Sequence, residues 1–131
     1  MESISTFSYA IPDRLGALGA LRSSLRAWLR EAGVDGDAAE DVVLAVWEIC
    51  ANAIEHPIRR HGEGVTLAAT ATAPGVRIAV QDTGSWREGD APRPGRGLGL
   101  RLARAMTDRL SILRGRRGTE IVMWRSTGGQ A

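Results

Sequence analysis

The stretch from residue 48 to residue 56 reads Glu48-Ile-Cys-Ala-Asn52-Ala-Ile-Glu-His56, and its polar spacing decides the fold prediction. Residues four apart share one face of an α-helix, so Glu48, Asn52 and His56 would form a polar stripe on an otherwise apolar helix. An amide oxygen together with nucleotide phosphates suits a magnesium ion, and a carboxylate one turn away can take a proton from a hydroxyl group or water. The alternative is an amphipathic helix whose polar side faces solvent.

Two glycine-bearing segments follow this helix. The first reads Val80-Gln-Asp82-Thr-Gly84-Ser-Trp86 and carries a buried strand into an aspartate, although an aspartate there can also cap a turn. The second reads Gly95-Arg-Gly97-Leu-Gly99-Leu100 and precedes a helical pattern, where the free N–H groups of a helix start attract phosphate. These glycines follow a proline-rich loop instead of the first strand of a βαβ unit, which disfavours a Rossmann dinucleotide site.

The basic residues exclude one common kind of phosphate site. All 17 of them are arginine. A Walker A loop needs a lysine to reach the β- and γ-phosphates, and Schiff-base catalysis needs a lysine amine. A nucleoside triphosphate would therefore have to be bound by another fold.

The order of the segments resembles the GHKL ATPase superfamily. Glu48-x-x-x-Asn52 is similar to its N box, Asp82-x-Gly84 to its G1 box, Gly95-x-Gly97-x-Gly99 to its G2 box, and Gly118-Thr119 to its terminal Gly-Thr element. The resemblance implies the Bergerat fold. This is an α/β two-layer sandwich in which a mixed, mostly antiparallel sheet carries three helices on one face.

Within that superfamily the chain resembles the anti-sigma factor serine/threonine protein kinases of the RsbW/SpoIIAB type. The resemblance implies an ATP- and Mg²⁺-dependent kinase that phosphorylates a STAS-type anti-sigma-factor antagonist, sequesters a sigma factor and forms a homodimer. Arg22 falls where relatives often carry a partner-facing arginine, or it is an ordinary exposed side chain. Trp86 stands where many relatives have a second glycine, and residues 85–94 are short for a lid. These departures leave open a non-catalytic anti-sigma binding module with weak or no nucleotide binding.

The resemblance also implies a role for each site residue. Glu48 would be the general base, Asn52 the magnesium ligand, and Asp82 the acceptor for the adenine amine, with Thr119 assisting. His56 would contact phosphate or lid, or else act as a helix-end cation that interacts with the helix dipole. The predicted nucleotide-binding set is Asn52, His56, Asp82, Gly84, Gly95, Gly97, Leu98, Gly99, Leu100 and Thr119.

Composition and charge bound the remaining possibilities. A length of 131 residues fits one domain over residues 1–131, and a hydrophobic share of 44% is ordinary for a globular protein. The net charge is +2, and the arginines are dispersed except for Arg114, Arg116 and Arg117, which we expect in a solvated hairpin turn. Direct binding of nucleic acid is therefore not expected. No apolar run of 18 residues and no signal pattern occur, which predicts a cytoplasmic protein without membrane contact.

The single cysteine, Cys50, precludes an internal disulfide, and its place in an apolar helix predicts a packing role instead of a reactive thiol. One cysteine and two histidines also make no structural zinc set.

Hydrophobic periodicity predicts the order β-α-α-β-β-α-β-β. An opening strand covers residues 3–10, and a first helix begins at Pro12 and Asp13 and ends near Gly33. The second helix covers residues 38–56, capped by Asp35 or Asp37. The remaining predicted segments are strands at 65–72 and 76–81, a helix at 98–107, a closing hairpin of 110–114 and 119–125, and a frayed tail at 126–131.

Overall fold

The computed structural model describes residues 4–11, 15–55, 65–82, 97–115 and 118–127. The elements in chain order are β1 (Ser5–Ile11), a single 3₁₀ turn (Leu15–Ala17), α1 (Leu18–Glu31), α2 (Gly36–Glu55), β2 (Val65–Thr72), β3 (Gly75–Asp82), α3 (Gly97–Met106), β4 (Arg109–Gly115) and β5 (Gly118–Ser126). Every predicted helix and strand is present. The largest difference is at the first helix, which enters through the 3₁₀ turn, a common form of helix start.

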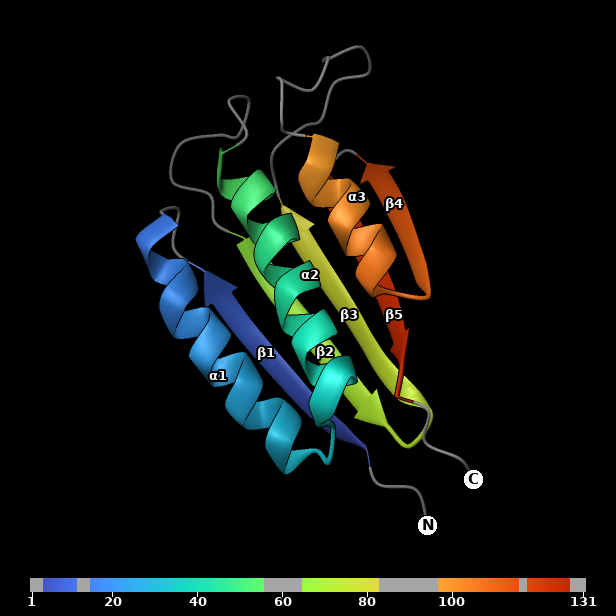
Figure 1. The fold of residues 1–131 in the computed structure, drawn as a ribbon. Helices are drawn as coiled ribbons and strands as arrows, with labels where there is room; N and C mark the ends of the chain where they lie inside the picture. Colours follow the sequence, from blue (N-terminus) through green and yellow to red (C-terminus); the bar gives the residue numbers. More distant parts are fainter. Residues whose placement is uncertain (1–3, 12–14, 56–64, 83–96, 116–117, 128–131) are drawn as a thin grey trace.

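The five strands form one sheet in the order β1-β2-β3-β5-β4, and each neighbouring pair is antiparallel. The last strand in the sequence therefore lies inside the sheet, between β3 and β4. Figure 1 shows α1, α2 and α3 side by side on one face of this sheet. The predicted α/β two-layer sandwich is confirmed.

The core lies between the helices and the sheet. Along β2, Val65, Leu67, Ala69 and Ala71 are buried and alternate with more exposed residues, as expected of a strand covered on one side. On α1 the buried residues recur at three- and four-residue intervals: Leu18, Leu21, Leu25, Trp28 and Leu29. The apolar side of α1 and the apolar side of β2 thus both face the core.

Gly33 ends α1, as predicted. Its φ of 84° lies in the left-handed region that glycine adopts without a steric penalty, and the N–H of Val34 returns to the carbonyl of Leu29 at 2.8 Å. The chain can then turn and begin α2 three residues later, at Gly36.

The C-terminal prediction needs a correction, because the ordered strand runs further than expected. Ser126 belongs to β5, and its N–H donates to Oδ2 of Asp108 at 2.7 Å. The hydroxyl of Thr127 donates to the carbonyl of Ala73 at 2.9 Å, in the turn between β2 and β3. Residues 126 and 127 of the predicted frayed tail are thus ordered, and residues 128–131 lie outside the described part. In the described part, no helix combines the length and apolar character needed to cross a membrane.

Candidate functional site

Asp82 and Thr119 are the two buried polar side chains among the described residues, each 3% exposed. Asp82 is the last residue of β3 and Thr119 the second residue of β5, and the strand register places them directly opposite each other. Asp82 lies two residues after the buried Val80, and Thr119 two residues before the buried Ile121. Residues two apart on a strand point to the same side, so both polar side chains lie on the sheet face that carries the helices. Burying a carboxylate in a protein is unfavourable unless polar groups compensate it. A pair of this kind at the edge of a core is therefore a candidate site.

The backbone beside Thr119 explains the glycine that precedes it. Gly118 has a φ of 121°, a value that side-chain-bearing residues rarely adopt, and it opens β5 opposite Gly115. The Gly118-Thr119 pair thus combines a turn that needs glycine with a hydroxyl that faces Asp82.

Glu48 and Asn52 lie on α2, both half-buried. Asp41 lies on the same stripe, seven and eleven residues earlier, and its Oδ2 accepts hydrogen bonds from Arg125 Nε at 3.2 Å and Nη2 at 2.9 Å. Arg125 belongs to β5, so this bond fixes the stripe to the side of α2 that faces β5. The predicted grouping of Glu48 and Asn52 on one helix face is consistent with this geometry.

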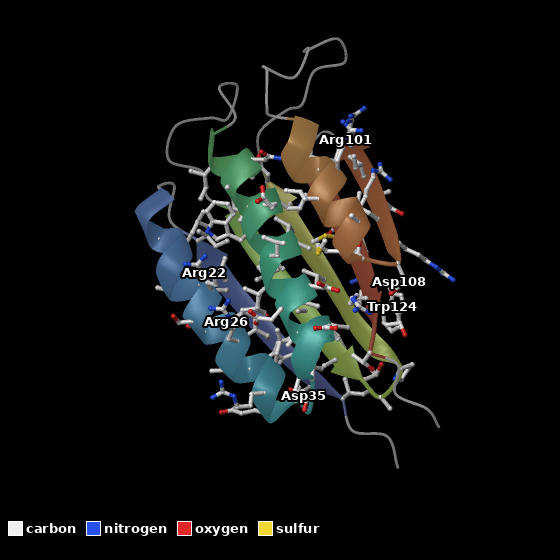
Figure 2. All side chains as sticks on the ribbon, viewed as in Figure 1. Arg22, Arg26, Asp35, Arg101, Asp108 and Trp124 are labelled. Atoms are coloured by element: carbon white, nitrogen blue, oxygen red, sulfur yellow. The ribbon has the colours of Figure 1, made fainter. Side chains whose placement is uncertain are left out.

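Helix α3 packs against α2 on that same side. Gly97, Leu98 and Gly99 form its first turn, and the half-buried Leu100 packs against the core. The positive end of the helix dipole and the free N–H groups of a helix start favour anions there. Arg101 lies near this end of α3, exposed to solvent (Figure 2).

These parts meet at one end of the molecule. Figure 1 shows the C-terminal end of α2, the end of β3, the start of α3 and the start of β5 together there. Of the predicted residues, Glu48, Asn52, Asp82, Gly97, Leu98, Gly99, Leu100 and Thr119 belong to these elements. His56, Gly84 and Gly95 lie outside the described residues, so their predicted roles stay predictions.

The sequence did not single out Val65, which lies opposite Asp82 on the other side. Its side chain is fully buried, so Asp82 is flanked by an apolar residue on β2 and a hydroxyl on β5. Apolar alternation marked Val65 as core, but a cross-strand neighbour can be identified only when the register is known.

A divalent ion at this site would need ligands from the bound nucleotide in addition to those of the protein. Within the described ranges, no three His, Cys, Asp or Glu side chains gather to hold a metal. A magnesium ion keeps several waters and is commonly bound through one or two protein oxygens plus substrate phosphates. The single carboxamide of Asn52 fits that chemistry.

Cys50 lies between Glu48 and Asn52 in sequence, yet it points into the core. Its side chain is fully buried, and this burial raises the pKa of the thiol to about 12. The thiol is thus not a nucleophile at neutral pH, and the predicted packing role is confirmed.

Comparison with known proteins gives the site a context. Residues 11–125 match the family described as "Histidine kinase-like ATPase domain". The crystal structure of the RsbU and RsbW domains of Rv1364c from Mycobacterium tuberculosis is similar at 28% identity and a TM-score of 0.73, over 93% of this chain and 32% of that one. The histidine kinase domain of the blue-light activated histidine kinase EL346 from Erythrobacter litoralis shares the fold at 24% identity and a TM-score of 0.59, over 89% of this chain and 62% of that one.

The chain thus spans about a third of the first of these proteins and less than two thirds of the second. The family match, in contrast, takes in the candidate site, β2, β3, β4 and β5 as far as Arg125, and of β1 it includes Ile11 alone. On that match, the chain belongs to the family of histidine kinase-like ATPase domains.

Proposed function

We propose that this protein is an ATP-dependent serine/threonine kinase and anti-sigma factor, which phosphorylates a STAS-type antagonist and sequesters a sigma factor in the cytoplasm. The observation that carries the ATP-binding part is the buried Asp82–Thr119 pair, which lies at the end of the molecule where the Glu48–Asn52 stripe and the start of α3 meet. The likeness to an RsbW domain supports the choice of pathway.

In this proposal the two ends of the nucleotide meet different chemistry. The carboxylate of Asp82 accepts a hydrogen bond from the exocyclic amine of adenine, and Thr119 adds a hydroxyl beside it. Guanine has a carbonyl at that position and would repel the carboxylate, which gives selectivity for ATP over GTP. The phosphates lie toward the first turn of α3, with Gly95, Gly97 and Gly99 allowing close approach of backbone N–H groups.

Transfer of the γ-phosphoryl group then needs positioning and a proton acceptor. The serine oxygen of the antagonist bonds to the γ-phosphorus while the bond to the β-phosphate oxygen breaks and ADP leaves. The carboxylate of Glu48 takes the serine proton, and the amide oxygen of Asn52 would hold the metal. When bound, Mg²⁺ offsets the charge of the phosphates.

The partner surface in this proposal includes α1. Arg22 is exposed and lies on α1 beside apolar residues of α1 and α2. Figure 2 shows Arg22 on α1, the helix at one side of the helical layer. An acidic residue of the antagonist or of the sigma factor would pair with this arginine.

Titration calorimetry with ATP, ADP and GTP, followed by phosphate transfer from labelled ATP to a candidate antagonist, tests the proposal. We expect Asp82→Asn to abolish nucleotide binding, because the amide presents a donor as well as an acceptor at the adenine position. Asn52→Ala should weaken Mg²⁺-dependent ATP binding, whereas Glu48→Gln should retain ATP binding and lose phosphate transfer.

Gln81→Ala is the matched control. Gln81 precedes Asp82 on β3 but is exposed on the opposite sheet face, so its truncation should leave the binding heat unchanged. An absence of binding heat in the wild type would instead remove the ATP-binding part and leave the non-catalytic anti-sigma module as the alternative. ATP binding without transfer to any antagonist would remove the kinase assignment.

A further inference from the structure

Strand β4 forms one edge of the sheet. It pairs with β5 on one side, and no strand in the described part of the chain pairs with its other side (Figure 1). Alternate residues of an edge strand direct their backbone N–H and C=O groups away from the sheet, and an extended segment of another chain can bind to these groups as a further strand. The opposite edge of the sheet is β1. A comparison of the two edges indicates what kind of segment would bind at β4.

The edge at β4 is strongly basic. Residues 97–115 form α3, β4 and the turn between them, and they contain four arginines and one aspartate, which gives a net charge of +3. The whole chain has a net charge of only +2. Strand β1, in contrast, contains no charged residue. The positive charge is therefore concentrated at one edge of the sheet.

Three of the four arginines lie on the side of this edge that carries the helices. On β4, Arg114 is two residues after Ile112, which packs against the core, so both point to the helical side. On α3, Arg101 and Arg104 are three residues apart and share one face of the helix. Figure 2 shows Arg101 near the start of α3, on the side toward β4. All three arginines are exposed.

The other side of β4 is mixed in character. Leu113 lies there with 55% of its surface exposed, which is unusual for a large apolar side chain. Ser111 and Arg109 precede it at alternate positions and point to the same side. A strand added to β4 would thus meet arginines on its helical side and an exposed leucine on the other.

The four arginines of this segment have no acidic partner among the described residues. None of their side chains forms an ion pair or a hydrogen bond there, whereas Arg26 and Arg125 each contact a carboxylate. Asp108 is the one acidic residue of the segment, and its carboxylate accepts the N–H of Ser126 at 2.7 Å. The positive charge of the edge can therefore pair with an anionic group from another molecule.

We infer that β4 and α3 together bind an extended acidic segment of another protein, which adds a further strand to the five-stranded sheet. Backbone hydrogen bonds to the outer side of β4 would hold the segment in place. Its acidic residues, at alternate positions, would lie against Arg101, Arg104 and Arg114. The positions between them would lie on the side of Leu113, where an apolar side chain fits. Nucleotide binding is not required for this contact.

The charges at this edge disfavour two other occupants. Pairing of β4 with β4 of a second copy would bring the arginines of both copies together, and like charges on neighbouring strands are destabilising. A nucleic acid would pair its phosphates with the arginines but leave the backbone groups of β4 unpaired, and neither α3 nor β4 has an aromatic side chain to stack on bases. An acidic strand satisfies both the charges and the backbone groups.

Fluorescence anisotropy of the full chain with a labelled eight-residue peptide of alternating Glu and Val tests the inference. The wild type should bind this peptide and should not bind the same peptide with Lys in place of Glu. Arg101→Glu with Arg104→Glu in one chain should raise the Kd about tenfold or more, because attraction becomes repulsion at two positions. The matched control is Arg22→Glu with Arg30→Glu, which makes the same change of charge at exposed positions of α1 and should bind like the wild type.

Amide hydrogen exchange followed by NMR separates strand addition from simple charge attraction. Saturating peptide should slow the exchange of alternate amides of β4 and leave the amides of β1 unchanged, because only one edge is covered. Methylation of the peptide nitrogens gives a second test. Alternate N–H groups of a strand point to opposite edges, so methylating one of the two alternate sets should abolish binding and methylating the other should not.

Any one of four results would overturn the inference: no binding of the acidic peptide to the wild type, equal loss of binding in the α1 control, unchanged exchange of the β4 amides, or equally tight binding of an oligothymidylate of the same charge. The last result would indicate a general polyanion site. The circular dichroism of each variant should match that of the wild type. If the α3 variant is unfolded, the exchange of the wild-type amides and the methylated peptides still decide the question.

Discussion

At the residue scale, Cys50 makes the stability of the protein depend on alkaline pH. An unfolded thiol has a pKa near 8.5, and burial raises the pKa of Cys50 to about 12. Between these values the unfolded chain loses the proton while the native chain keeps it, so the free energy of unfolding falls as pH rises. Below pH about 8 this group adds no pH dependence. Denaturant titrations of wild type and Cys50→Ala at pH 7 to 10 should show a steeper loss in the wild type.

The same burial predicts that a thiol reagent reacts with Cys50 only after the chain unfolds. At pH 8 the native protein should stay unmodified for hours, whereas the denatured chain reacts at once. Fast labelling of the folded protein would show that α2 opens locally and that the thiol is not a core group.

Gly75 is required because no room exists for a side chain at this position, and not because of its backbone conformation. Its φ is not positive, yet an added Cβ would lie 2.5 Å from the Trp124 ring and 2.6 Å from the carbonyl oxygen of Arg125. The carbonyl cannot move without disturbing β5, so Gly75→Ala should lower the free energy of unfolding by about 1–3 kcal/mol. Gly115→Ala is the control, since a Cβ there meets nothing within 4 Å. Equal stability of the two variants in urea would contradict this reading.

At the element scale, two ion pairs with similar distances should differ in strength because they differ in exposure. Arg125–Asp41 joins β5 to α2 at 2.9 Å with side chains 23% and 30% exposed. Arg26–Glu40 joins α1 to α2 at 3.1 Å with side chains 46% and 63% exposed. Water screens the second pair more completely, so its coupling energy should be within about 0.5 kcal/mol of zero, while the first should reach about 1 kcal/mol. Double-mutant cycles in urea measure both.

The Arg125–Asp41 pair also connects stability to the site, because Asp41 shares its helix face with Glu48 and Asn52. Loss of the ion pair in Asp41→Asn should therefore lower the nucleotide affinity as well as the free energy of unfolding. The matched change Glu40→Gln, one residue earlier and on the exposed side of α2, should affect neither property measurably.

At the scale of the whole molecule, periodicity predicted the elements because it reports which face of each element is buried. The three- and four-residue spacing of Leu18, Leu21 and Leu25 predicted α1, and the alternation after Val65 predicted β2. The resemblance predicted Asp82 and Thr119 as site residues, and both prove buried and opposite each other. The register that joins them depends on pairings between distant segments. No local pattern encodes these pairings.

The strand order predicts how the molecule responds to truncation. The final strand, β5, pairs with β3 on one side and β4 on the other, and it is the partner that joins β4 to the sheet. A chain ending at residue 127 keeps these pairings and the contacts of Ser126 and Thr127 with Asp108 and Ala73, so it should unfold cooperatively at the wild-type urea midpoint.

A chain ending at residue 117 lacks β5, and with it Ile121, Met123 and the Arg125–Asp41 bond. It leaves β3 as an unpaired edge and β4 without a strand that joins it to the sheet, and this loss exceeds the few kcal/mol by which a domain of this size is stable. We therefore expect no cooperative transition by circular dichroism and strong binding of a hydrophobic dye. A cooperative transition in the shorter chain would mean that β1, β2 and β3 with their helices form a stable unit, and that β5 only extends it.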